Sequence, residues 1–154
     1  MKAAALAISA LSMAIIPKAM AGNVLPDGVE PFSVQQVIDR YSGYTVGLDR
    51  GGMFFSPDGS VTAYSTTGHA EEIGVGNWTV NGNEFCSDVN WKSKRETTKE
   101  IQCKKFYKLG SGTIIQETKD TNYNYLSVYP DTQFLYQGDK VHGKYLEVEK
   151  LISQ

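Results

Sequence analysis

The sequence predicts a mainly β protein, a single antiparallel meander of about nine strands that closes as a barrel or barrel-like sandwich, with one short helix before it. Two observations predict this fold. From Tyr44 onward, short runs of β-prone residues alternate with turn residues at roughly 8–12-residue spacing. No long crossover of the kind that joins parallel strands separates these runs. We therefore expect neighbouring runs to fold back on each other.

The N-terminus has the three parts of a secretory signal peptide. Lys2 gives a basic start, Ala3 to Ile16 form an apolar run of 14 residues, and Ala19-Met20-Ala21 is an A-x-A cleavage site. The apolar run is shorter than the roughly 20 residues of a membrane-spanning helix. We expect residues 1–21 to be removed after Ala21, leaving a periplasmic or extracellular protein with no stable membrane insertion.

Removal of these 21 residues from the 154 leaves 133, a length that fits one domain. Pro26, Asp27, Gly28 and Pro31 predict an extended arm over residues 22–32, and residues 33–154 are expected to form a single β-rich domain. The mature chain has 17 acidic and 13 basic residues, a net charge of −4. This balance argues against nucleic acid as a partner, because nucleic-acid binding needs a basic surface.

The first predicted element is a helix that begins at Ser33. Ser33 and Gln36 have the spacing of a capping box, in which each side chain binds the free backbone N–H of the other residue. Gly43 is a natural stop for this helix. Four apolar residues at i, i+3, i+4 and i+7 form one stripe: Val34, Val37, Ile38 and Tyr41.

Turn sequences divide the rest of the chain into strands. Asp58-Gly59 and Asn81-Gly82 are the strongest hairpin signals, because these residue pairs tolerate the positive φ angles of tight turns. The β-prone runs are 44–48, 53–56, 60–66, 77–80, 84–91, 100–108, 113–119, 124–129, 132–137 and 141–148.

Cys86 and Cys103 are the two cysteines, and in an exported protein they predict one disulfide. A redox pair would usually be C-x-x-C, and a zinc site needs more ligands. Direct pairing of the two cysteines in a hairpin would place Phe85 and Val89 opposite Lys104 and Glu100, mixing apolar and charged faces. A bulge or another strand register would avoid this mixture, and the sequence leaves the choice open.

Aromatic residues alternate along two late strands and are candidates to line a pocket for an apolar ligand. They are Tyr123, Tyr125, Tyr129, Phe134 and Tyr136. Ordinary packing of aromatic rings on strands explains the same pattern.

A basic segment is the second candidate site. It contains Lys92, Lys94, Arg95, Lys99, Lys104, Lys105 and Lys108. With Glu96 and Glu100 between them, the local net charge is +5. Such a patch favours binding to an anionic surface or an acidic partner. The alternative is a solvated hairpin whose lysines protect an exposed sheet edge.

The sequence contains no recognisable motif for metal binding or catalysis. His69 with Glu71 and Glu72 offers metal-ligand types without the spacing of a known metal motif, so we predict no metal and no cofactor. Motifs of hydrolases, phosphate-binding loops and zinc proteases are absent, so we assign no catalytic residue.

Four short segments carry a family resemblance: Gly43-Tyr44-Thr45, the run Phe55 to Gly59, the run Gly76 to Val80, and Cys86. In this order, after the helix, they resemble a family of small exported bacterial proteins catalogued as domain of unknown function 995, over Val34 to about Gly143. The resemblance implies export and a β-rich fold, and it brings no catalytic residues. Gly76-x-Trp78 with two cysteines is also similar to lipocalin-like periplasmic barrels, as an architectural likeness, because at least three strands precede it here.

We therefore expect a non-enzymatic binding module. Its partner would be a small apolar ligand held among the aromatic strands or a protein met through loops. An inhibitor acting through a protruding loop near Lys92 to Lys99 is one alternative. A hydrolase without a recognisable motif, with a cleft at His69 or His142, is the other.

Overall fold

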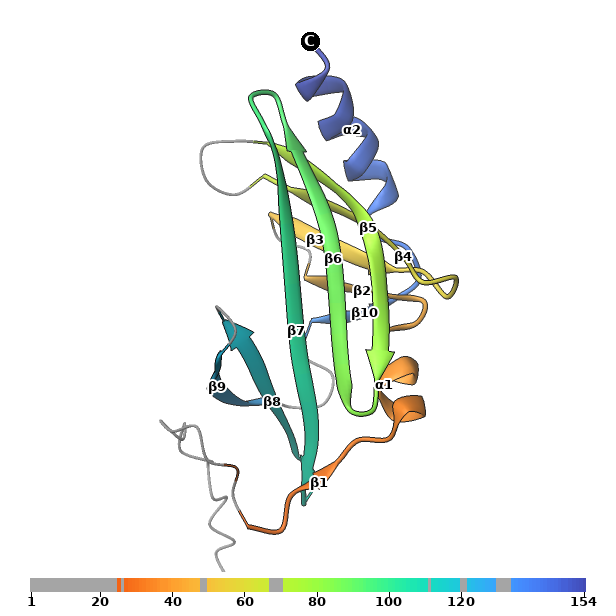
Figure 1. The fold of residues 1–154 in the computed structure, drawn as a ribbon. Coiled ribbons are helices and arrows are strands. Elements are labelled where there is room, and N and C mark those ends of the chain that lie inside the picture. Colours follow the sequence, from red (N-terminus) through yellow and green to blue (C-terminus); the bar gives the residue numbers. More distant parts are fainter. Residues whose placement is uncertain are drawn as a thin grey trace, which may run out of the picture.

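The protein is a curled antiparallel sheet with a helix packed on each face (Figure 1). The computed structural model describes residues 25, 27–47, 50–66, 71–110, 112–119, 122–129 and 134–154. Within these ranges the strand order is β10-β2-β3-β4-β5-β6-β7-β8-β9, and β1 pairs with β7 beside this path. The predicted mainly β antiparallel meander is confirmed. The strands are β1 Glu30–Pro31, β2 Tyr44–Gly47, β3 Gly51–Phe55, β4 Ser60–Ser65, β5 Glu72–Asn81, β6 Glu84–Ser93, β7 Thr97–Leu109, β8 Gly112–Lys119, β9 Asn122–Tyr129 and β10 Leu135–Gln137.

Helix α1 (Val34–Tyr41) forms as the sequence predicts. The Ser33 hydroxyl accepts a hydrogen bond from the Gln36 N–H at 3.2 Å, and the Gln36 side chain accepts one from the Ser33 N–H at 2.8 Å. The capping box is therefore complete. Val37 and Tyr41 are the buried residues of the predicted apolar stripe, so α1 covers the sheet with one side.

Aromatic rings fill the face of the sheet under α1, which we call the inner face and define by Phe55, Trp78 and Phe85. These three side chains are all less than one-tenth exposed. The Tyr41 ring of α1 stacks on Phe85 with 4.1 Å between ring centroids, and the Phe55 ring meets Phe85 edge-on at 5.1 Å. Phe106 of β7 closes the cluster and is fully buried. This part of the inner face is filled by the protein's own side chains.

Strand β5 is longer than the predicted strand 77–80, and Gly74 and Gly76 lie within it. These glycines allow β5 and β6 to approach closely. A Cβ atom on Gly76 would overlap the carbonyl oxygen of Asp88. Trp78 follows on the inner face, and its indole N–H donates to the carbonyl oxygen of Ser56 at 2.8 Å. Glycines inside a strand often mark such a close approach.

The expected strand at 141–148 is wrong, because this segment is part of helix α2 (His142–Ile152). Asp139 starts the helix: its carboxylate accepts hydrogen bonds from the N–H groups of Val141 at 2.8 Å and His142 at 3.0 Å. Four residues with helical spacing then face the sheet: Val141, Tyr145, Val148 and Ile152. The structure thus has a C-terminal helix that the sequence analysis did not predict.

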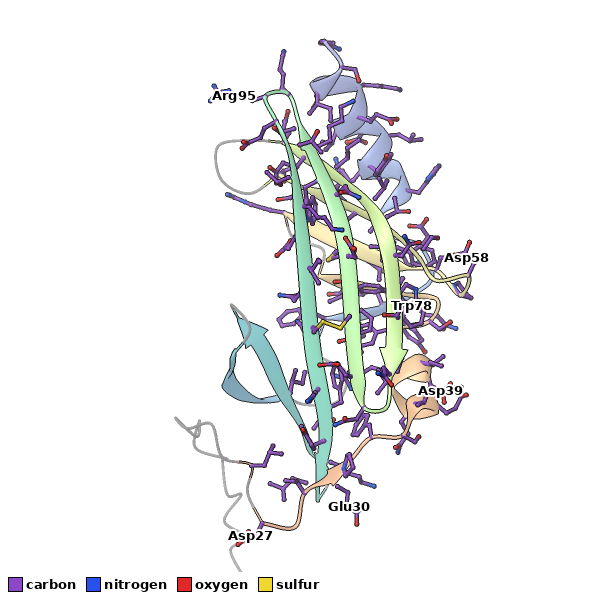
Figure 2. All side chains as sticks on the ribbon, in the orientation of Figure 1. Asp27, Glu30, Asp39, Asp58, Trp78 and Arg95 are labelled. Carbon is purple, nitrogen blue, oxygen red and sulfur yellow. A yellow bond between two sulfur atoms is a disulfide. The ribbon has the colours of Figure 1, made fainter. Side chains whose placement is uncertain are left out.

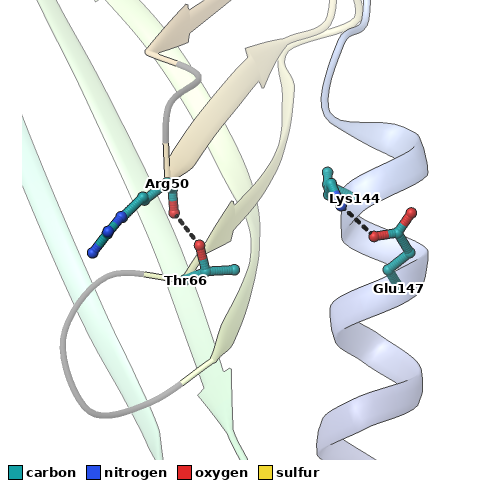
Figure 3. Close-up of polar contacts among 4 residues, drawn as sticks. All are labelled: Arg50, Thr66, Lys144 and Glu147. Carbon is teal, nitrogen blue, oxygen red and sulfur yellow. Dashed lines mark hydrogen bonds and ion pairs between the residues drawn. The ribbon is translucent and has the colours of Figure 1, made fainter.

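Helix α2 packs on the outer face of the sheet, the face opposite Phe55 and Trp78. There its apolar stripe meets Tyr64 of β4 and Ile73 of β5. The exposed side of α2 carries an ion pair between Lys144 and Glu147 (Figure 3). The Thr66 hydroxyl donates to the carbonyl oxygen of Arg50 at 2.9 Å (Figure 3). This hydrogen bond links the start of β3 to the end of β4. Neither helix in the described ranges is long and apolar enough to cross a bilayer.

Candidate functional site

The candidate site is the β6–β7 ribbon, which we define as Glu84 to Leu109. It contains the disulfide and the whole predicted basic patch. Figure 1 shows β6 and β7 as long strands whose connecting turn reaches one end of the molecule. Arg95 lies at this turn, which we call the tip (Figure 2).

A disulfide joins Cys86 to Cys103 across the ribbon, as the sequence predicts (Figure 2). The two cysteines are direct cross-strand partners in a register without a bulge, so neither of the two rearrangements considered in the sequence analysis is needed. Phe85 does lie opposite Lys104, and Val89 opposite Glu100. The mixture is tolerated because β6 lies over the aromatic core, whereas this part of β7 lies at the border of the core, with Glu100 exposed and Lys104 half-buried.

The hydrogen bonds at the two ends of the ribbon fix the direction of its main-chain groups. The Ser93 N–H donates to the Glu96 carbonyl at 2.9 Å, and the Phe106 N–H donates to the Asn83 carbonyl at 3.0 Å. Hydrogen-bonded and non-hydrogen-bonded pairs alternate in an antiparallel ladder. The even-numbered residues of β7 therefore direct their N–H and C=O groups toward β6, and Cys86 and Cys103 form a non-hydrogen-bonded pair.

Ser93 fixes the conformation of the tip. Its buried hydroxyl accepts hydrogen bonds from the N–H groups of Arg95 at 3.2 Å and Glu96 at 3.1 Å. Serine side chains commonly stabilise turns by binding N–H groups just after them. The side chains of Lys94 and Arg95 are exposed on this turn. A local sequence feature, Ser93 before Lys94-Arg95-Glu96, thus holds two cations at the end of the ribbon.

Cross-strand side-chain contacts stiffen the ribbon below the tip on both faces. On the inner face, the Trp91 indole N–H donates to the Glu100 carboxylate at 2.9 Å. On the outer face, the Lys99 ammonium pairs with the Asp88 carboxylate at 2.9 Å. The sequence analysis missed these supports, because identifying them requires the strand register that it left open.

The structure divides the predicted basic patch into separate groups. Lys92, Lys94 and Arg95 are exposed at the tip. Lys99 lies below them and is engaged with Asp88. Lys104 and Lys105 are half-buried, and Lys108 is exposed near the other end of the ribbon, opposite Glu30 of β1. At about 3.3 Å per residue, Lys108 lies about 40 Å from the tip. The seven residues therefore do not form one continuous patch.

The predicted aromatic alternation is only partly described. Tyr123, Tyr125 and Tyr129 belong to β9, but their side chains lie outside the described residues. Of the expected strand 132–137, Leu135–Gln137 form β10, and residues 130–133 lie outside the described residues. Phe134 has a φ of 66° and precedes the strand, so it does not continue the strand's alternation with Tyr136. Both side chains are about half exposed. Their role in ligand binding stays a prediction.

The candidate metal and acid–base residues are not brought together in the described ranges. His142 is exposed at the start of α2, and His69 lies outside the described residues. No group of three His, Cys, Asp or Glu residues suited to a metal ion occurs in the part of the chain that the structure describes. One carboxyl with a lowered pKa is that of Asp58, because the Ser60 hydroxyl and N–H donate hydrogen bonds to it in the β3–β4 turn. This is a turn-stabilising role.

Comparison with known proteins gives one finding. The model of a family described as "Protein of unknown function (DUF995)" matches residues 7–133. No curated protein and no solved structure matches the chain. The β6–β7 ribbon up to Leu109 lies entirely within the matched range.

Proposed function

We propose that this chain, which belongs to the DUF995 family of proteins of unknown function, is an exported binding module that recognises an acidic surface of a partner protein through the tip of its β6–β7 ribbon. The observation that carries the proposal is the rigid presentation of three exposed cations, Lys92, Lys94 and Arg95, at one end of the molecule. No cofactor and no catalytic residue enters this proposal.

Preorganisation supports the role of the tip. Binding usually loses free energy because flexible side chains and loops become ordered. Here Ser93 already fixes the turn, and the Trp91–Glu100 and Lys99–Asp88 contacts hold the strands beneath it. The backbone that carries the cations of the tip is therefore ordered before a partner arrives, which reduces the cost of binding.

Charge supports an acidic partner. The mature chain has a net charge of −4, yet its tip carries three cations against the single carboxylate of Glu96. A local positive field on an acidic protein orients the molecule as it approaches a negative surface, and it does so most strongly at low salt. This arrangement favours one defined contact over general adhesion of the whole molecule.

The filled inner face supports a protein partner over an apolar ligand. Tyr41, Phe55, Trp78, Phe85 and Phe106 occupy the inner face under α1 and are buried there. Export of the chain is part of the proposal. It is supported by the disulfide, because such bonds persist in oxidising compartments, and by the predicted signal peptide.

A charge-reversal experiment tests the proposal. The probe is poly-L-glutamate immobilised on a biosensor, and the analyte is the mature chain, residues 22–154. We expect the triple variant Lys92→Glu/Lys94→Glu/Arg95→Glu to lose at least about tenfold in affinity, because like charges then face each other. The matched control, Lys108→Glu/Lys140→Glu/Lys150→Glu, makes the same charge change at exposed positions elsewhere and should lose less than about threefold.

Two results would overturn the proposal. Equal losses in both triple variants would show that only the total charge matters. A second probe, vesicles of anionic phosphatidylglycerol, separates lipid from protein surfaces. Binding to the vesicles that depends on the tip, without such binding to poly-L-glutamate, would assign the tip to a membrane surface instead. Circular dichroism of each variant verifies that the fold is retained.

A further inference from the structure

The disulfide lies where strand β7 leaves the core of the protein. On the tip side of Cys103, the residues from Thr97 to Ile101 are all exposed. On the other side, Phe106 is fully buried in the aromatic cluster, and strand β8 begins to pair with β7 at Lys104. The bond between Cys86 and Cys103 therefore separates an anchored part of β7 from a part that lies outside the core.

The part of β7 between the tip and the disulfide rests on few non-covalent contacts. Among the described residues, β6 is the only strand that pairs with residues 97–103. The Trp91–Glu100 and Lys99–Asp88 pairs orient the two strands, but they contribute little free energy because both are open to solvent. Segments with few buried apolar contacts open locally more often than the core does. Since the disulfide closes the loop that contains the tip, it is the main restraint on this opening.

The bond is accessible to an attacking thiolate. Both cysteines are half-buried, and because Cys86 follows the inner-face residue Phe85, the bond lies on the outer face (Figure 2). Helix α2 packs over β4 and β5, a different part of this face. Thr79 of β5 flanks Cys86, whereas no strand in the described ranges pairs with Cys103 on the side away from β6. A thiolate attacks in line with the S–S bond, so this open side gives access to the Sγ atom of Cys103.

We propose that the disulfide is a site of reduction by a dithiol, and that its reduction releases the tip. A thiolate of the dithiol attacks the Sγ atom of Cys103, the S–S bond breaks, and Cys86 leaves as a thiolate that takes up a proton. The second thiolate of the dithiol then attacks the mixed disulfide and displaces Cys103. The dithiol loses two electrons and two protons and becomes a disulfide, and the two cysteines gain them as thiols.

Reduction would regulate the tip through the strand that carries it. Without the covalent closure, residues 97–102 separate from β6 more often, and the backbone of the tip is ordered for a smaller fraction of the time. The partner must then pay for that ordering, which weakens binding. This consequence for binding rests on the proposed function, whereas the reduction and the local opening do not.

The kinetics of reduction test whether the folded protein is attacked. The oxidised mature chain is mixed with dithiothreitol, and alkylated cysteines are counted by mass spectrometry. The rate should rise in proportion to the dithiothreitol concentration and stay the same in about 1 M urea, because direct attack needs no unfolding. Reduction through global unfolding would instead accelerate about tenfold in this urea concentration, and that result would overturn the proposal. Thr79→Ala should leave the rate unchanged, and a faster rate would overturn the assignment of Cys103 as the attacked residue.

Amide hydrogen exchange measured by NMR tests the local opening. The N–H groups of Thr98, Glu100 and Gln102 point to β6, and in the reduced chain they should exchange at least about tenfold faster than in the oxidised chain. The Phe106 N–H, which donates to the Asn83 carbonyl in the anchored part of the ribbon, should change much less. An equal acceleration at all four amides would show a loss of global stability alone and would contradict a local release of the tip.

Binding to immobilised poly-L-glutamate tests the regulation. The reduced chain and the Cys86→Ser/Cys103→Ser variant should both bind at least about threefold more weakly than the oxidised chain. Equal affinities, together with faster exchange in the reduced chain, would refute the regulation of the tip. If the oxidised chain itself does not bind, the proposed function fails, while the reduction kinetics and the exchange rates still decide whether the disulfide controls the opening of the ribbon.

Discussion

At Gly76 the backbone of β5 lies so close to β6 that a side chain has no space. A Cβ atom there would overlap the carbonyl oxygen of Asp88 and would lie 2.8 Å from the Cα of Val89. Backbone atoms cannot rotate out of the way as the end of a flexible side chain can. Trp78, two residues later on the inner face, donates its indole N–H to the carbonyl oxygen of Ser56. One missing methyl group thus determines how closely two central strands pack.

Gly76→Ala should therefore destabilise the fold by about 1–3 kcal/mol, the usual cost of overpacking. Gly143→Ala is the matched control, because a Cβ atom on this exposed glycine of α2 meets nothing within 4 Å. Alanine is the better helix former, so this variant should gain up to about 1 kcal/mol. Urea denaturation of both variants measures the two effects. Equal changes in the free energy of unfolding would show that the strands accommodate the added methyl group.

Helix α2 illustrates which elements the sequence could predict. Helix α1 was predicted because its capping box and apolar stripe all lie within a few residues. In α2 the apolar spacing from Val141 to Ile152 is equally regular, but Gly138-Asp139 resembles a hairpin turn and Val141 to Val148 is rich in β-prone residues. The decision depends on contacts that are distant in sequence, namely burial of the stripe against Tyr64 and Ile73. Tertiary packing here decides between two plausible local structures.

The carboxylate of Asp139 accepts two backbone hydrogen bonds at the start of α2. Asp139→Ala removes the acceptor for the N–H groups of Val141 and His142 and should destabilise the protein by about 1 kcal/mol. Asp139→Asn keeps a side-chain oxygen that can accept these hydrogen bonds and should retain most of the stability. Urea denaturation again gives the free energies of unfolding. A loss that is the same for asparagine and alanine would show that these hydrogen bonds do not stabilise the protein.

Across the whole molecule, the composition of the candidate site was predictable and its geometry was not. The seven basic residues and both cysteines were identified from residue type and spacing alone. Their division into a tip, an engaged Lys99 and a remote Lys108 depends on the register of β6 with β7. The polar inner face of β7 concealed that register, because alternation predicts a strand's pairing only where one face is fully buried.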